Sequence, residues 1–475
     1  MGEHHEREYI QNLAPLIEKI WKEEEEKERA FSREHIEGIV RKVLDDAKGD
    51  QAELLIHGGE SALTRFANNI IHQNVSDRGL AISVRVDVGK RQGRFSTNIL
   101  TEEGLRFALD KAYELAKSSP ENPDWLPVLQ PQEYRELNNF FEKTSALSPE
   151  ERAEIVKRHI ERCKEKELSS AGILSNDENI IAIANTSGLF AYHRGTQAKF
   201  SATTSNGKTS GWAEDVSPDI EKLNFDEIST RSIEKAILNQ DPHDIDPGEY
   251  TVILEHSAVP EIFIYMAWMA FGARAVIEGT SFLKGKVGKK VFDERITITD
   301  DVHHPLSLGI PFDYEGHPTA KVNLIENGVA KGFVHDRLTA KEFGTESTGH
   351  ALPQPNPYGP IPRNLVISAG DSSLDEMIKA TERGILVTHF HYTNITDPMR
   401  MMVTGMTRDG TFLVENGKIA YPVKNLRFTQ SMIDALNNVV SISRDQKTVS
   451  AFFGGSMVVP AIKINNFRFS STTDF

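Results

Sequence analysis

The sequence predicts an α+β protein in which N-terminal α/β modules precede a large, mainly antiparallel β domain with a buried central helix. Three observations lead to this class. Apolar residues recur at helical spacing in parts of the first half, and alternate with polar residues in the strands between them. In the second half, Asn-Gly and Asp-Gly pairs separate short apolar runs. Alternation is typical of strands with one buried face, and these dipeptides favour hairpin turns.

The first part of the chain is expected to form a polar helix followed by an α/β module. Residues 1–31 carry an apolar stripe beside the acidic run 23–26, which indicates a helix with a solvated face or an interaction tail. Ser32 and Thr101 are plausible N-caps of two further helices. The module is predicted to cover residues 32–131, with separate strands at 53–57, 61–66, 70–73, 80–88 and 94–97.

A central α/β segment is expected over residues 132–240. Ser148 followed by Pro149 and Glu151 has the pattern of a capping box with proline in the first turn, so a helix should begin there. The periodicity of this helix turns Cys163 toward the core, which favours a structural thiol over a nucleophile. Because Cys163 is the only cysteine, an internal disulfide is excluded.

The last predicted domain covers residues 247–475, after a boundary rich in proline and acidic residues at 241–248. Near its start, residues 262–271 form a helical pattern that is apolar on every face, and such helices are normally buried. The remainder reads as short strands joined by hairpin turns, and turns are expected at Asn327-Gly328, Asp409-Gly410 and Asn416-Gly417.

Composition narrows the classes of function. With 54 Lys and Arg against 69 Asp and Glu, the formal net charge is −15, and no basic stripe of the kind that binds nucleic acid or an anionic membrane is present. The N-terminal residues lack a signal-peptide pattern, and the apolar run 262–273 is too short to span a bilayer. A cytoplasmic protein without nucleic-acid or membrane partners is therefore expected.

Two segments contain candidate functional residues. His389 and His391 are two apart in a predicted strand, so both side chains should face the same side. They would reach one substrate group or one ion, or simply form hydrogen bonds in a cavity wall. Residues 344–363 contain five prolines and three glycines without a secondary-structure pattern, which indicates either the wall of a binding cavity or a plain surface connection.

Several short motifs, taken in order, resemble the TldD/PmbA family of bacterial and archaeal proteins over nearly the whole chain. Each motif alone is weak, but their order is specific. The matching segments are 61–69 (SALTRFANN), 79–85 (GLAISVR), 184–188 (ANTSG), 210–212 (SGW), 247–252 (PGEYTV), 313–319 (DYEGHPT), 325–328 (IENG), 331–332 (KG) and 414–423 (VENGKIAYPV).

The resemblance implies one of two roles. TldD-type members hold zinc through an HExxxH helix and a C-terminal cysteine and hydrolyse unfolded peptides, whereas TldE/PmbA members lack these ligands and pair with TldD around a cavity. Counted back from the similar segment 281–288, the three key positions here are Ile264, Tyr265 and Met269. None offers a zinc ligand or a carboxylate base, and segment 449–456 has no cysteine. The chain thus resembles the TldE/PmbA side.

The sequence accordingly predicts a non-catalytic subunit without a cofactor of its own, paired with a TldD-like zinc subunit or with itself. An unfolded peptide would bind as an added strand, with His389, His391, Arg400 and Arg408 as cavity residues. Alternatively, both arginines form ion pairs at the surface. Two alternatives remain: an independent metal-dependent hydrolase with a rearranged site at His389 and His391, and a stand-alone peptide-binding homodimer.

Overall fold

The structure, a computed structural model, describes residues 31–451 and 455–473, so the helix expected at 1–31 lies almost entirely outside the described residues. The chain divides into two compact units. Helices and mainly antiparallel strands occur together, which confirms the α+β class. None of the helices in the described ranges is long and apolar enough to cross a membrane. Among the described residues, unit 1 comprises 31–59, 78–132 and 179–193, and unit 2 comprises 60–77, 133–178, 194–451 and 455–473.

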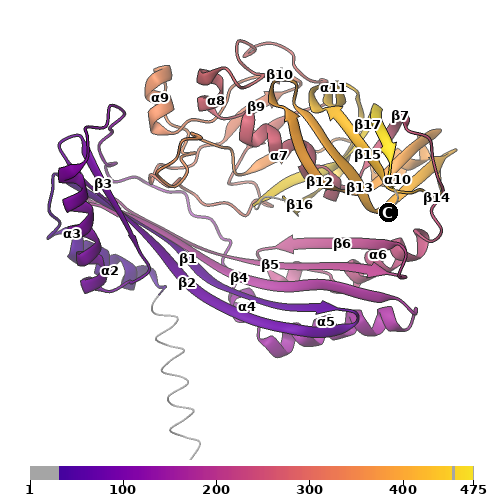
Figure 1. Ribbon diagram of the computed structural model, residues 1–475, viewed down its shortest axis with the longest axis horizontal. Helices are drawn as coiled ribbons and strands as arrows, with labels where there is room; N and C mark the ends of the chain where they lie inside the picture. Colours follow the sequence, from indigo (N-terminus) through magenta and orange to yellow (C-terminus); the bar gives the residue numbers. More distant parts are fainter. Residues whose placement is uncertain (1–30, 452–454, 474–475) are drawn as a thin grey trace, which may run out of the picture. The chain divides into compact units, whose positions relative to one another are not determined.

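A six-stranded sheet has the order β3-β2-β1-β4-β5-β6, and its long strands contribute residues to both units (Figure 1). The strand pairs expected at 53–57 with 61–66, and at 70–73 with 80–88, are each one continuous strand. The sheet consists of β1 (Gln51–Ala67), β2 (Ile70–Val88), β3 (Arg91–Thr97), β4 (Ser169–Asn185), β5 (Phe190–Ser205) and β6 (Ser210–Ser217).

The glycines between the expected strands explain this error. A Cβ on Gly58 would lie 2.1 Å from the carbonyl oxygen of Gly79, so β1 and β2 approach too closely for any side chain there. The sequence pattern suggested a break, but a glycine inside a strand also marks a place where two backbones come close together. Gly58 therefore permits β1 and β2 to pair closely where the sequence predicts the end of a strand.

Unit 1 packs two helices, α2 (Arg33–Leu44) and α3 (Glu102–Ser118), around one apolar core (Figure 1). Both predicted N-caps are confirmed, because Ser32 accepts a hydrogen bond from the His35 N–H and Thr101 accepts one from the Gly104 N–H. These bonds satisfy amide groups that have no partner within the helix. The caps thus fix where each helix begins.

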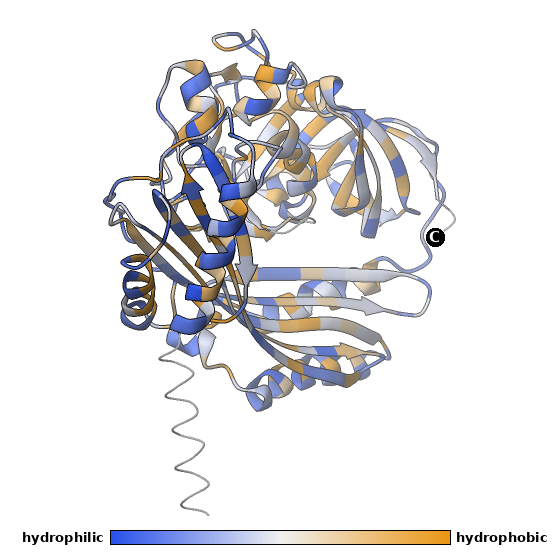
Figure 2. Ribbon diagram, turned by 60° about the vertical axis from the view of Figure 1, so that its left-hand side comes forward, coloured by the Kyte–Doolittle hydropathy of each residue, from blue (hydrophilic) through white to orange (hydrophobic). Residues whose placement is uncertain are grey.

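In unit 2, the helices α5 and α6 cover apolar residues of β4, β5 and β6. The predicted capping box is confirmed: Ser148 accepts from the Glu151 N–H, and Glu151 accepts from the Ser148 N–H. Alternating buried and partly exposed residues along β5 give this strand one face toward the core, and Figure 2 shows the mixture of hydrophobic and hydrophilic residues along the strands. The helical elements are α4 (Glu142–Ser145), α5 (Pro149–Lys164), η1 (Ile220–Lys222) and α6 (Phe225–Leu238).

The second sheet has eleven strands among the described residues. Five of them, β17, β15, β13, β12 and β7, close into a ring because β7 pairs with both β12 and β17. Most pairs are antiparallel, as predicted. The strands are β7 (Gly248–Leu254), β8 (Ile298–Asp300), β9 (Val322–Glu326), β10 (Val329–Ala330), β11 (Leu365–Ile367), β12 (Arg383–Asp397), β13 (Met402–Glu415), β14 (Lys418–Pro422), β15 (Leu426–Ser431), β16 (Val439–Ser450) and β17 (Ser456–Thr472).

The helix predicted to be apolar on every face is α7 (Pro260–Met269), and seven of its residues are buried. It belongs to the largest apolar cluster of the molecule, together with residues from most strands of the second sheet. Burial removes the cost of exposing an apolar helix surface to water. The other short helices of this region are η2 (His256–Ala258), α8 (Ala273–Glu278), α9 (Arg337–Phe343), α10 (Leu374–Lys379), η3 (Pro398–Arg400) and α11 (Met432–Asn437).

One predicted hairpin turn is wrong. Asn327-Gly328 and Asn416-Gly417 do lie between consecutive strands, but Asp409-Gly410 lies inside β13. The register of β12 and β13 shifts here, with Val387 opposite Thr411 and His389 opposite Arg408. One extra residue on β13 therefore forms a β-bulge, with Asp409 at a φ of 55°. An Asp-Gly pair is typical of a hairpin turn and of a β-bulge alike, because each needs a residue with positive φ.

Cys163 is fully buried, as the helical periodicity predicts. It packs with Leu168, Ile233 and Ala236, and its Sγ lies 3.6 Å from His159 Nε2 and 3.8 Å from Thr204 Oγ1. Burial raises the pKa of the Cys163 thiol, which lowers the thiolate fraction at neutral pH. The thiol is therefore both inaccessible and weakly nucleophilic.

We expect Cys163 to be unreactive toward Ellman's reagent in the native protein at pH 8. Because the chain has a single cysteine, the assay should report no thiol in native buffer and one per chain in denaturant. Rapid reaction under native conditions would contradict the packing of α5 against α6.

Candidate functional site

A polar cluster connects β6 with the β12–β13 pair inside unit 2. We call it the His389 cluster, and it comprises Ser210, Trp212, His389, His391, Arg408 and Asp409. The bulge in β13 creates this arrangement, because it places Asp409 beside His389 rather than in regular register. A Cβ on Gly410 would lie 2.6 Å from Thr388 Oγ1, so glycine is required next to Asp409.

Asp409 is the centre of the cluster. Its Oδ2 lies 2.8 Å from His389 Nε2, and its Oδ1 accepts a hydrogen bond from the Ser210 hydroxyl. Arg408 Nε lies 3.7 Å from the same carboxylate, and an Arg408 Nη1–H group donates to His391 Nε2. The carboxylate thus balances the charge of Arg408 and fixes the orientation of the His389 ring.

Trp212 holds His389 from the side of β6. The two rings stack with their centroids 4.5 Å apart and an angle of 4° between their planes. Trp212 is in turn fixed by a hydrogen bond from its Nε1–H to Ser201 Oγ. A Cβ on the preceding Gly211 would lie 2.3 Å from the Ala236 amide nitrogen, so close packing of α6 on β6 requires glycine here.

The charges in the cluster shift two pKa values. Burial raises the pKa of the Asp409 carboxyl, but His389, Ser210 and Arg408 outweigh burial and hold it below its ordinary value. Burial, the Arg408 charge and His389 together lower the pKa of His391. At neutral pH, Asp409 is therefore ionised and His391 is neutral, which allows His391 Nε2 to accept the hydrogen bond from Arg408.

The structure brings together three of the four predicted cavity residues. His389, His391 and Arg408 share the cluster, and Phe390 between the histidines points into the core, as strand alternation requires. Arg400 is not part of it: it lies in η3, its side chain is 77% exposed, and its Nε is 3.8 Å from Asp397. Sequence reasoning missed Ser210, Trp212 and Asp409. The SGW motif was a usable signal for the first two.

The side chains around His389 and His391 give little support to the alternative of a rearranged metal site there, because too few of them could bind a metal ion. No group of three or more His, Cys, Asp or Glu side chains suited to a metal ion occurs within residues 31–451 and 455–473. His391 Nε2 faces the Arg408 guanidinium, and that positive charge opposes a metal cation at the same atom.

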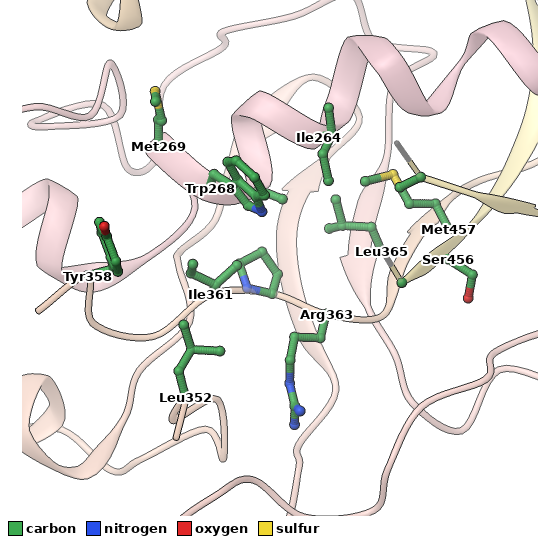
Figure 3. Close-up of a pocket in the computed structure, with 14 residues that line it drawn as sticks. Ile264, Trp268, Met269, Leu352, Tyr358, Ile361, Arg363, Leu365, Ser456 and Met457 are labelled. Carbon is green, nitrogen blue, oxygen red and sulfur yellow. The ribbon is translucent and has the colours of Figure 1, made fainter. Parts of the chain in front are cut away.

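A cavity of about 740 Å³ lies beside α7, and we call it the α7 cavity. Its volume falls within the roughly 300–1,000 Å³ typical of ligand sites. Figure 3 shows residues of α7 above the segment that carries Ile361, Arg363 and Leu365. The described lining residues are Ile264, Ala267, Trp268, Met269, Leu352, Tyr358, Ile361, Pro362, Arg363, Leu365, Ala451, Gly455, Ser456 and Met457.

The α7 cavity contains two of the three positions that the family resemblance connects with zinc. Ile264 and Met269 line it, whereas Tyr265 is buried nearby and donates its hydroxyl to the Thr393 carbonyl oxygen at 2.6 Å. No described lining residue is His, Cys, Asp or Glu. These side chains do not fit a zinc ion, because its protein ligands are thiolates, imidazoles and carboxylates.

The segment 344–363 forms a wall of this cavity, which agrees with the first of the two interpretations of its proline-rich sequence. Close backbone contacts hold it in place. A Cβ on Gly272 would lie 2.2 Å from the Pro360 carbonyl oxygen, and one on Gly359 would lie 2.3 Å from Arg274 Cβ. The Asn356 side chain also accepts from the Tyr358 N–H and donates to the Gly359 carbonyl.

We expect Asp409→Asn to lower the free energy of unfolding by about 1.5–3 kcal/mol at pH 7, because it weakens hydrogen bonds made to a charged group. The effect should depend on pH. A carboxyl whose folded-state pKa is depressed stabilises the fold above the unfolded value near 4, and this contribution is lost as the pH falls through the folded value. The difference between wild type and variant should therefore shrink below about pH 4.

Urea unfolding at several pH values measures this effect. Asp110→Asn is a matched control, because Asp110 forms an exposed ion pair with Lys48 and should change the midpoint very little. Equal destabilisation by both variants would contradict a central role for Asp409.

Comparison with known proteins gives a consistent assignment. The PmbA/TldA metallopeptidase domain 1, central domain and C-terminal domain match residues 52–116, 142–240 and 247–471. A metalloprotease of Methanocaldococcus jannaschii is 24% identical over 86% of this chain and 92% of its own length. Metalloprotease PmbA of Escherichia coli O157:H7 is 23% identical over 89% of this chain and 96% of its own.

Among solved structures, TldE from Thermococcus kodakarensis superimposes with a TM-score of 0.81 and 26% identity, covering 92% of this chain and 99% of that one. The three domain matches account for well over half of the sequence, and they occur in the family's order. The chain therefore belongs to the PmbA/TldD family.

Proposed function

We propose that this protein is a non-catalytic, TldE/PmbA-like subunit that holds an unfolded peptide while a TldD-like partner supplies zinc and the hydrolytic step. The observation that carries the proposal is the lining of the α7 cavity. In a domain that matches a metallopeptidase, Ile264 and Met269 occupy the wall where metal ligands would be needed, and Tyr265 is bonded to Thr393. A phenol held in this way offers no carboxylate base.

The His389 cluster is the proposed contact for the peptide outside the α7 cavity. Arg408 is about half exposed, although Asp409 and His391 restrict its orientation. A fixed guanidinium loses less freedom on binding than a mobile one, so the cluster is suited to the main-chain carbonyls of an extended peptide. His389 acts by holding Asp409, and the exposed Arg400 is a second, weaker contact.

The test is peptide hydrolysis by three samples: this chain, an HExxxH-bearing TldD-type protein from the same genome, and an equimolar mixture. We expect no hydrolysis by this chain alone, and at least about tenfold faster hydrolysis by the mixture than by the partner alone. A chelator should abolish the activity of the mixture, because the metal belongs to the partner.

Two outcomes would overturn the proposal. One is chelator-sensitive hydrolysis by this chain alone. The other is stoichiometric zinc in the purified chain that is lost in the His389→Ala, His391→Ala double variant, which would favour the rearranged metal site. Unchanged rates on mixing, with peptide binding by a homodimer of this chain, would instead support the stand-alone binding protein.

A further inference from the structure

The space next to α7 in the α7 cavity has an almost entirely apolar surface. Ile264 and Leu365 extend toward each other from α7 and from the opposite wall, and Trp268 extends from α7 toward the segment that carries Ile361 (Figure 3). Most of the other described lining residues are apolar as well. Arg363 is the one charged residue of the described lining, so the direction of its side chain decides whether the cavity presents a charge to a ligand.

The guanidinium of Arg363 is directed away from α7 (Figure 3). Its carbon lies 4.9 Å from the centre of the Tyr314 ring, and its Nη2 lies 3.5 Å from the Phe312 carbonyl oxygen. Neither Tyr314 nor Phe312 is among the described lining residues. The charge is therefore held outside the space next to α7, and a charged group that entered this space would lose its hydration without gaining an ion-pair partner there.

The cavity is large enough for a bulky side chain together with part of the main chain that carries it. Its volume is about 740 Å³. An apolar cavity of roughly 150 Å³ is already sufficient to bind a benzene molecule. Ordered water is a poor occupant, because a buried water needs about two to four hydrogen-bond partners, and the described lining has few polar side chains besides the Ser456 hydroxyl. An apolar group therefore fits the cavity best.

Two aromatic residues of the lining are open to solvent and form the rim of the cavity. Trp268 is the one exposed residue of α7, at 39%, and Tyr358 on the opposite segment is 76% exposed. An apolar cavity bordered by exposed aromatic rings is typical of a surface that a ligand covers when it binds. The opening also allows a side chain to enter while the chain that carries it stays outside.

We propose that the α7 cavity receives one large apolar side chain, such as Phe or Leu, of an extended peptide whose main chain crosses the rim at Trp268 and Tyr358. This inference rests on the proposed peptide-binding function and names the class of peptide. The described lining residues all lie within the match to the metallopeptidase C-terminal domain, which favours a peptide over a free apolar molecule. Removing the apolar side chain from water is the main contribution to binding.

The wall opposite α7 is fixed before a ligand binds. A Cβ on Gly272, shortly after α7, would lie 2.2 Å from the Pro360 carbonyl oxygen, so the two walls are in direct backbone contact. Asn364 donates to the buried carboxylate of Asp300 from its backbone N–H at 2.7 Å and from its side chain at 3.1 Å. A cavity that is already formed loses little conformational entropy on binding, so it selects a side chain by size and polarity.

Fluorescence anisotropy with the full-length chain tests this selection. The probes are N-terminally labelled peptide amides of the sequence Gly-Ser-Gly-Xaa-Gly-Ser-Gly, with Phe, Leu, Ala or Glu at the central position. We expect the Phe and Leu peptides to bind at least about tenfold more tightly than the Ala peptide, because only their side chains fill the cavity. The Glu peptide should bind no more tightly than the Ala peptide, because the cavity offers its carboxylate no ion-pair partner.

A variant that fills the cavity should remove the selection. Ala267→Leu adds a larger side chain to the α7 wall, and we expect the Phe and Ala peptides to bind this variant within about twofold of each other. Trp268→Ala removes an aromatic ring from the rim and should weaken binding of the Phe peptide at least about threefold. Ala420→Leu, at an exposed position of β14, is the matched control and should keep the wild-type ratio.

Equal affinity of wild type for the Phe and Ala peptides would overturn the inference without any variant, so it stays testable even if Ala267→Leu fails to fold. A selection that persists in folded Ala267→Leu would place the apolar contact elsewhere and would also overturn it. Two further outcomes would identify a different occupant. Stronger displacement of the Phe peptide by decanoate than by unlabelled Phe peptide would indicate a free apolar molecule, and a peptide-independent dimer that Ala267→Leu abolishes would indicate a second copy of the chain.

These outcomes differ from failure of the proposed function. If only the selection is absent, the four peptides bind with similar affinity and the mixture with the TldD-type partner still hydrolyses peptide. Failure of the function removes both peptide binding and the hydrolysis by the mixture, and this inference with them.

Discussion

The burial of α7 is the constraint on which the C-terminal domain depends. This helix has no polar face, so the strands and loops around it cover most of its surface, and Trp268 is its one exposed residue. Each fully buried Ile, Phe or Met side chain contributes roughly 1.5–3 kcal/mol relative to exposure, and α7 provides several of them. The same packing decides the chemistry of the adjacent cavity, because core residues such as Ile264 also line its wall.

Local rules predicted the features that depend on neighbouring residues. The caps at Ser32, Thr101 and Ser148, the buried position of Cys163 and the burial of α7 all follow from residue type and spacing within one helix. The errors arose where another segment determines the outcome. The pattern predicts separate strands at 53–57 and 61–66 because it does not show that Gly79 passes beside Gly58. It predicts a turn at Asp409-Gly410 because bulges and turns use the same residues.

In the candidate site, too, some features follow from neighbouring residues and others depend on distant segments of the chain. Strand alternation placed His389 and His391 on one face, and the register of β12 with β13 adds Arg408. The residues that give the cluster its charge balance and rigidity, Asp409, Ser210 and Trp212, come from a bulge and from a strand about 200 positions away in the chain. No local pattern predicts such a contact. A motif shared with a family marked Ser210 and Trp212, but only the structure shows what they touch.

The two arginines illustrate why partners matter more than residue type. Arg408 lies beside Asp409, so much of its charge is balanced within the protein, and an added anion gains little from it. Arg363 has no such carboxylate among the described residues, and its guanidinium lies against the Tyr314 ring and the Phe312 carbonyl oxygen instead. From sequence alone, Arg408 was a candidate cavity residue and Arg363 was not. The two arginines differ in whether a carboxylate of the protein already balances their charge, and this depends on tertiary contacts that the sequence does not show.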